Sequence, residues 1–216
     1  MKLSEELYKK AESIWIDAIR QPFLVEMAKG TLPEELFRNY MIQDYLYLTD
    51  YIDILNEAAG LSDDKETADF FSGIIEATRN ETFRVHLAQM KKMGIGDDEV
   101  KNSLKSDVIK EYIKYLHKQM SEGGILEGLT ALLQCSWNYA YIGQTMYEQY
   151  KKDIENSPYK EWFYAYSDGD YLFSNKLWID MIDKKTQHID SERADKLCKI
   201  FVRCAEFENS FWNALL

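Results

Sequence analysis

The amino-acid sequence predicts an all-α protein, and three observations carry that prediction. Apolar residues recur at helical spacing along almost the whole chain, only five valines occur, and no convincing alternating run indicates a strand. At 216 residues and 46% hydrophobic, the chain can bury a core without disulfides or metals. No internal repeat and no Pro/Gly/Ser-rich linker divides it. We therefore expect a single-domain helical bundle over residues 1–216.

Capping and break signals predict where the helices begin and end. Pro33, followed by two acids, is typical of a first helical turn, and residues 62–64 and 168–170 carry similar capping signals. Glycines at 94–96 and 123–124 are breaks. The expected helices span residues 4–20, 33–59, 63–92, 107–121, 125–153, 158–166, 169–184 and 190–215.

Charge and cysteine usage exclude several classes of protein. The formal net charge of -11 opposes binding to phosphate backbones or anionic membranes, and no basic patch offsets it. Three cysteines without Cys-x-x-Cys spacing suggest neither a disulfide framework nor a zinc site. The N-terminus lacks an apolar signal region, and the most apolar stretch, 124–143, carries polar residues. We expect a cytoplasmic protein with no nucleic-acid or membrane partner.

Two carboxylates interrupt apolar stripes. Asp44 falls in the middle of the stripe of the second expected helix, and Glu208 falls inside the seam of the last one. Burying a charge costs several kcal/mol unless it is paired, so each acid either has a buried structural partner or serves a ligand. Together they favour an internal polar pocket.

The helix expected from Ile125 is apolar nearly all round, as is typical of a central helix, and it places Cys135 and Tyr139 on one face. A free cysteine is usually only a small buried hydrophobe. As a nucleophile, Cys135 would need hydrogen-bond donors and a proton shuttle nearby. The candidate helpers are Tyr112, Tyr139, Tyr166 and Glu208.

Known cofactor motifs do not occur in the sequence. The three histidines show no metal-binding spacing and no Glu-x-x-His occurs, so we expect no metal. Glycine-rich nucleotide loops and the Gly-x-Ser-x-Gly elbow are also missing. The residues alone indicate a helical protein with a polar, aromatic pocket.

Four segments resemble the TenA/thiaminase II family, in its cysteine-containing subgroup: residues 43–48 (QDYLYL), 131–139 (ALLQCSWNY), 162–166 (WFYAY) and 208–212 (ENSFW). Their order and spacing match the family over essentially the whole chain. One departure is Gln134, where many members carry proline. The resemblance implies a heme-oxygenase-like helical fold, a homotetramer, and an aminopyrimidine aminohydrolase of thiamine salvage without metal or organic cofactor.

The same resemblance implies roles for seven residues. Cys135 would add to the pyrimidine ring and Glu208 would move protons. The substrate, 4-amino-5-aminomethyl-2-methylpyrimidine or more slowly thiamine, would be bound or flanked by Asp44, Tyr47, Tyr112, Tyr139 and Tyr166.

Three alternatives stay open. A related PQQ-biosynthesis-type oxidase or metal-dependent oxygenase predicts histidines in the pocket, where the seams instead carry Asp, Cys, Tyr and Glu. The second alternative is a non-catalytic regulator or ligand-binding module. The acidic charge and the lack of a helix-turn-helix signal argue against direct DNA contact by such a regulator. A TenA-like enzyme could also act on a divergent pyrimidine.

Overall fold

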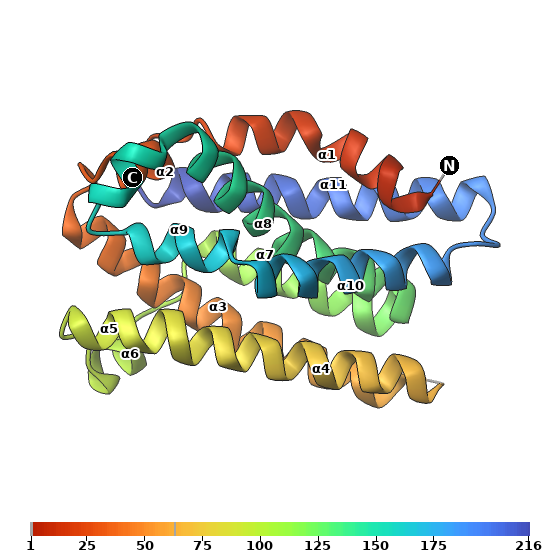
Figure 1. The fold of residues 1–216 in the computed structure, drawn as a ribbon. Helices are drawn as coiled ribbons and strands as arrows, with labels where there is room; N and C mark the ends of the chain where they lie inside the picture. Colours follow the sequence, from red (N-terminus) through yellow and green to blue (C-terminus); the bar gives the residue numbers. More distant parts are fainter. Residues whose placement is uncertain (1, 63) are drawn as a thin grey trace.

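The computed structural model describes residues 2–62 and 64–216, with the side chains of all but residues 81, 83 and 84, and every regular element in this part of the chain is helical (Figure 1). Two elements, η1 and η2, are π-helical turns. In chain order the elements are α1 (Leu3–Ala18), α2 (Pro22–Lys29), α3 (Glu34–Leu61), α4 (Lys65–Glu81), η1 (Thr82–Leu87), α5 (Ala88–Lys92), α6 (Asp97–Asn102), α7 (Asp107–Lys118), η2 (Gln119–Gly123), α8 (Ile125–Asn156), α9 (Lys160–Ser167), α10 (Gly169–Lys185) and α11 (Ser191–Ala214).

The structure confirms the all-α prediction and corrects it in two places. It adds two short helices, α2 and α6, which are too short to show a clear apolar period. Pro22 at the first turn of α2 and Gly30 at its end, with φ 71°, are nevertheless ordinary start and stop signals. The sequence of α2 therefore contained the information, and the periodicity criterion missed it.

The long helix expected over 63–92 is helical but not regular. Its expected first residue, Asp63, lies outside the described residues. Asp64 caps α4, accepting from the backbone N–H of Thr67 at 2.8 Å. Beyond α4 the chain widens into the π turns of η1 before α5 resumes α geometry. The periodicity predicted the helix but not this change of pitch.

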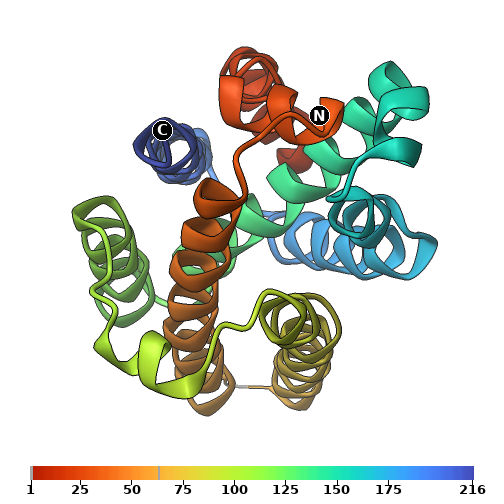
Figure 2. The same ribbon diagram turned by 90° about the vertical axis from the view of Figure 1, so that its left-hand side faces the viewer.

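The central helix is α8, as its apolar sequence predicted. It packs against α1, α2, α3, α7, α9, α10 and α11. Its glycine at 143 permits a close approach of α9, because a Cβ there would lie 2.6 Å from the backbone carbon and 2.7 Å from the backbone oxygen of Tyr166. Figure 2 shows α3 running through the bundle with α7 on one side and α4 on the other, and α3 contacts both.

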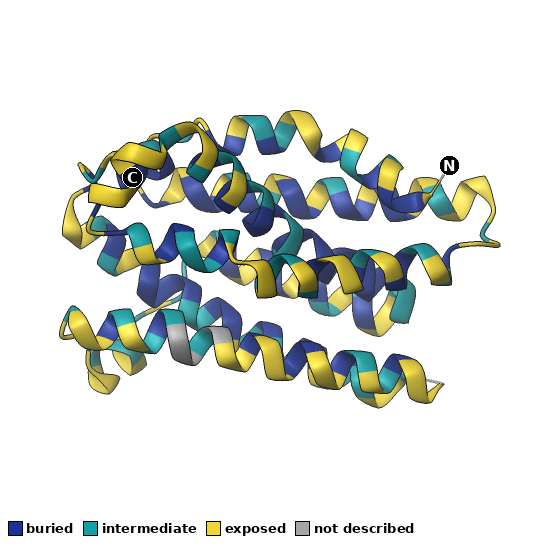
Figure 3. Cartoon of the chain, viewed as in Figure 1, coloured by how far each residue is buried: buried dark blue, intermediate teal, exposed yellow. Residues whose placement is uncertain are grey.

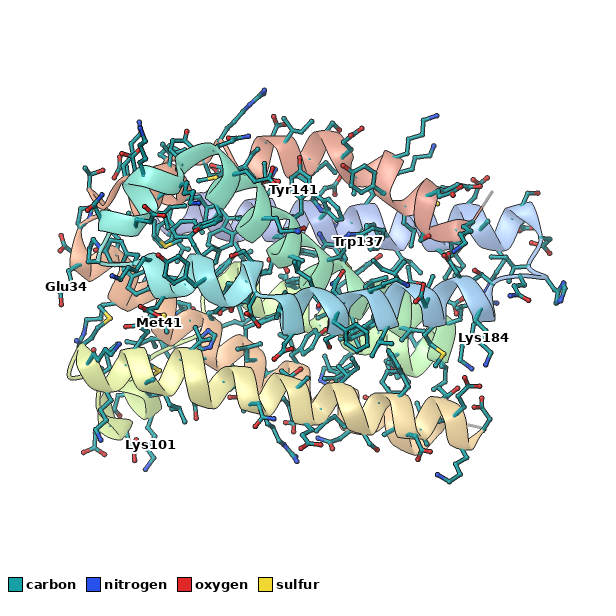
Figure 4. The ribbon with its side chains drawn as sticks, in the orientation of Figure 1. Glu34, Met41, Lys101, Trp137, Tyr141 and Lys184 are labelled. Atoms are coloured by element: carbon teal, nitrogen blue, oxygen red, sulfur yellow. The ribbon has the colours of Figure 1, made fainter. Side chains whose placement is uncertain are left out.

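The two faces of α8 differ in character. Trp137 and Tyr141, labelled in Figure 4, point toward α1, where their rings lie 5.5 Å and 5.3 Å from that of Trp15. On another face of α8, Tyr139 donates to Asp44 of α3 and packs against Tyr166 of α9, and Cys135 lines the same cavity as these side chains. The buried positions of Figure 3 follow the inward faces of α3, α8 and α11. The apolar contacts around α8 thus fix the face that carries the cysteine.

In the part of the chain that the structure describes, no helix is both long enough and apolar enough to cross a membrane.

Candidate active site

A cavity of about 670 Å³ lies between α3, α4 with η1 and α5, α8, α9 and α10. Four of the residues singled out in the sequence line it: Asp44 from α3, Cys135 and Tyr139 from α8, and Tyr166 from α9. Its outer part carries polar and charged side chains, among them Lys92, Glu161, Asp168 and Asp170. The cavity is of the size that small-molecule sites usually have.

A second, narrow space of about 10 Å³ continues from the first on the side of α7 and α11. Asp44 and Tyr139 belong to both spaces, which places the two next to each other. The remaining three sequence candidates, Tyr47, Tyr112 and Glu208, line the narrow one. The structure thus brings all seven candidates together around one buried region.

Glu208 and Cys135 meet at this junction although 73 residues separate them in the chain. The thiol of Cys135 and the hydroxyl of Tyr112 both lie within hydrogen-bonding reach of the Glu208 carboxyl group. Burial, with a smaller contribution from the charge of Asp44, raises the pKa of Glu208 to about 8, against the lowering effect of those two neighbours. Near neutral pH this carboxyl group therefore carries a proton.

Asp44 instead has three hydrogen-bond partners. Its Oδ2 atom accepts from the Tyr40 hydroxyl at 3.0 Å and lies 2.5 Å from His86 Nε2. Its Oδ1 atom accepts from the Tyr139 hydroxyl at 3.2 Å. Tyr40 in turn accepts from the indole N–H of Trp162 at 2.8 Å. A carboxylate with only 3% exposure is thereby compensated by hydrogen bonds.

The tyrosines form two groups around these acids. Tyr112 stacks between Tyr47 and Phe207, with ring centroids 5.4 Å and 5.1 Å away, and donates to Gln134 Oε1 at 3.3 Å. Tyr166 packs 4.9 Å from the ring of Tyr139. Burial raises the pKa of Tyr47, Tyr112 and Tyr139 well above the ordinary value, so their hydroxyls stay protonated donors.

His86 is the site residue that the sequence analysis missed. It is fully buried and its Nε2 atom lies 2.5 Å from Asp44 Oδ2, although the sequence analysis assigned it no role at the site. Helical periodicity could not find it, because η1 shifts the phase of the helix at this point. Within the described residues, no group of three or more His, Cys, Asp or Glu side chains is arranged to hold a metal ion.

The fold and the site define a heme-oxygenase-like helical bundle that encloses a thiol, two acids and several phenols around a ligand-sized cavity. The chain belongs to the TENA/THI-4/PQQC family, whose model matches residues 8–216. The resemblance seen in the sequence is therefore confirmed at the level of the family.

Curated relatives cover nearly the whole chain. It is 30% identical over 213 residues to a protein of Helicobacter pylori named aminopyrimidine aminohydrolase, covering 99% of this chain and 98% of the relative. A protein of the same name from Halalkalibacterium halodurans is 29% identical, with 99% and 95% covered. Among solved structures, a TenA homologue from P. horikoshii OT3 superposes with a TM-score of 0.87 at 25% identity, covering 100% of this chain and 98% of that one.

Proposed function

We propose that this protein is an aminopyrimidine aminohydrolase that cleaves 4-amino-5-aminomethyl-2-methylpyrimidine to the hydroxymethylpyrimidine and ammonia, and thiamine more slowly, by covalent cysteine catalysis. The observation that supports it best is the meeting of Cys135 with the protonated Glu208 at a cavity that Asp44 and Tyr139 also line. The names of the curated relatives point to the same substrate class.

In the first step Cys135 adds to C6 of the pyrimidine ring as a thiolate, its thiol proton having passed to the Glu208 carboxylate beside it. The S–C6 bond forms, the ring electrons shift toward C5, and the bond from the 5-methylene to the amine breaks. Glu208 gives its proton to the departing amine, which leaves as ammonia. The result is a ring held to the enzyme through sulfur, with an exocyclic methylene at C5.

In the second step water adds to that methylene. Glu208, now a carboxylate, takes a proton from the water, the C6–S bond breaks, and the thiolate of Cys135 is restored. Atoms and charges balance, because one water is consumed and one ammonia released. A carboxyl group with a pKa of about 8 suits both halves, since it is a proton donor near neutral pH and a competent base once ionised.

Asp44 and the tyrosines would hold the ring. Asp44 presents an acceptor oxygen to the 4-amino edge, as a carboxylate does with amidine-like groups. The rings of Tyr139 and Tyr166 supply flat apolar surface, and the hydroxyls of Tyr47 and Tyr112 lie on the side of Glu208. The homotetramer implied by the family resemblance and the cytoplasmic location expected from the sequence stay predictions.

Ammonia release from the aminomethylpyrimidine tests the proposal. We expect turnover by the wild-type protein and at least a ~1000-fold loss in Cys135→Ser, because a serine hydroxyl is a far poorer nucleophile at neutral pH. Cys198→Ser is the matched control, since Cys198 is also buried but lines neither space, and it should keep full activity.

Two outcomes would contradict the proposal in different ways. Turnover by Cys135→Ser at the wild-type rate would overturn the covalent mechanism while leaving the substrate in place. No ammonia release by the wild-type protein, with no cleavage of thiamine either, would favour a divergent pyrimidine substrate or a binding role.

A further inference from the structure

His86 is a buried titratable side chain next to the site that the proposed mechanism does not use. None of its surface is exposed, and its Nε2 atom lies 2.5 Å from Asp44 Oδ2. Its other ring nitrogen, Nδ1, has no hydrogen-bond partner among the described residues. Within the described structure, the hydrogen bond to Asp44 is therefore the one that the His86 imidazole makes.

The backbone around His86 is built to place it there. Residues 82–87 form π turns between α4 and α5, and η1 contacts both α3 and α9. A π turn bonds residues i and i+5 and therefore rotates less per residue than an α-helix. The buried face that contains Thr78 consequently continues through His86 to Met90. Such π turns within helices are frequent at functional sites.

The direction of the hydrogen bonds follows from the neighbouring groups. The indole of Trp162 can only donate, so the Tyr40 oxygen accepts from it and the single Tyr40 proton goes to Asp44 Oδ2. Because an ionised carboxylate oxygen can only accept, His86 Nε2 is placed as the second donor to Oδ2. The protonated nitrogen of His86 is thus Nε2.

The acceptor sites of Asp44 are then unequally filled. A carboxylate offers about four lone-pair sites, two on each oxygen. Tyr40 and His86 occupy both on Oδ2, whereas Oδ1 receives only Tyr139. The open acceptor site is therefore on Oδ1, next to the hydroxyl of Tyr139. A neutral aminopyrimidine edge needs one acceptor for its amino group and one donor for its ring nitrogen.

We infer that His86 is a positioning residue for substrate binding. By holding Oδ2, it fixes the rotation of the Asp44 carboxylate so that Oδ1 faces the ligand as acceptor. The Tyr139 hydroxyl, whose single proton points at Oδ1 in this structure, would turn to the adjacent ring nitrogen when the amino group of the ligand binds Oδ1. His86 itself touches no substrate atom. This role rests on the proposed function for the identity of the ligand.

Two variants separate positioning from structural support or proton transfer. His86→Gln keeps an N–H donor in nearly the place of Nε2 but has no titratable group, whereas His86→Leu has no donor. For aminomethylpyrimidine hydrolysis we expect KM to rise about 10- to 100-fold in His86→Leu, the range for a lost hydrogen bond to a charged group, with a much smaller change in kcat. His86→Gln should restore most of that loss.

Three outcomes would overturn the inference. An unchanged KM in His86→Leu, whatever its thermal stability, would leave His86 a purely structural residue. Equal loss of kcat in both variants with KM unchanged would indicate proton transfer instead. If His86→Leu does not fold, the test rests on His86→Gln. A folded His86→Gln whose KM is raised as far as we expect for His86→Leu would overturn the positioning role. His117→Gln is the matched control, because His117 is about half exposed and pairs with Glu57 away from both spaces.

A measurement without turnover keeps this test separate from that of the proposed function. In ¹⁵N-histidine-labelled wild-type protein, the shifts of His86 should show a proton on Nε2, and Asp44→Asn should move them. An unprotonated Nε2 would overturn the inference even in an active enzyme. If the protein released no ammonia but His86 behaved as expected, the proposed substrate would fail while the coupling to Asp44 stood.

Discussion

Asp44 and Glu208 are both buried carboxyl groups of the same region, each 3% exposed, yet their surroundings are opposite. Asp44 has three donors directed at it from α3, η1 and α8. Within the described structure, Glu208 has the Tyr112 hydroxyl and the Cys135 thiol in reach, and its Oε1 atom has no partner. Burial therefore does not decide what a carboxyl group does. The number of donors around it does.

The comparison predicts different kinetic losses at the two acids, the largest at Glu208. Glu208→Gln removes the proton shuttle but keeps the shape, so kcat for ammonia release should fall by about 10²- to 10⁴-fold with little change in KM. Steady-state kinetics near pH 7 measures this. A variant with wild-type kcat would remove Glu208 from the mechanism.

Asp44→Asn is the matched change at the other acid. An asparagine turns one acceptor into a donor that faces existing donors, so binding should suffer before chemistry does. We expect KM to rise roughly 10- to 100-fold, as for the loss of a hydrogen bond to a charged group. If Asp44→Asn lowered kcat alone, the assignment of binding to Asp44 and proton transfer to Glu208 would be reversed.

The raised pKa of Glu208 also predicts how the free energy of unfolding changes with pH. The pKa of Glu208 is about 8 in the folded protein against 4.5 for the free side chain, so between these values the folded chain binds a proton that the unfolded chain lacks. By linkage this contribution is full below about pH 4.5 and is lost as the pH rises through 8. It amounts to a few kcal/mol on the order-of-magnitude scale of 1.36 kcal/mol per pKa unit.

Glu208→Gln should remove that dependence. Urea unfolding of both proteins at pH 5, 7 and 9 should show the wild-type free energy of unfolding falling relative to that of the variant as the pH rises. Groups common to both proteins cancel in the difference. Parallel curves would mean that Glu208 is not held protonated by burial.

The smallest effect is expected at Tyr40, one of the two donors to Asp44 Oδ2. Tyr40→Phe leaves the buried indole N–H of Trp162 without an acceptor, which should cost about 1–3 kcal/mol of unfolding free energy. KM should change less than in His86→Leu, because the imidazole still holds Oδ2. Urea unfolding and kinetics on the same preparation check both parts, and a KM increase as large as that of His86→Leu would contradict them.

The sequence predicted the fold and the two acids for the same reason. Helical periodicity is regular in α3 and α11, so a charged residue that interrupts an apolar stripe can be recognised, as Asp44 and Glu208 were. The central position of α8 followed from its apolar circumference. Each of these predictions uses information that lies within a single helix.

What the sequence could not predict depends on relations between helices or on irregular geometry. The approach of Cys135 to Glu208 requires α8 and α11 to pack in one particular register, which no local pattern encodes. The buried position of His86 was not predicted, because the π turns of η1 break the helical period from which inward-facing residues are recognised. The helix α2 escaped because eight residues are too few to establish a period.

The glycine at 143 carries a consequence for the shape of the cavity. Where α9 packs against α8, the two backbones lie too close for any side chain at residue 143. Even a methyl group there would lie 2.6–2.7 Å from main-chain atoms of Tyr166. Tyr166 is one of the residues that line the cavity. The position of this cavity wall therefore depends on residue 143, which does not itself line the cavity, and one added carbon there would change the width of the cavity without changing any of the side chains that line it.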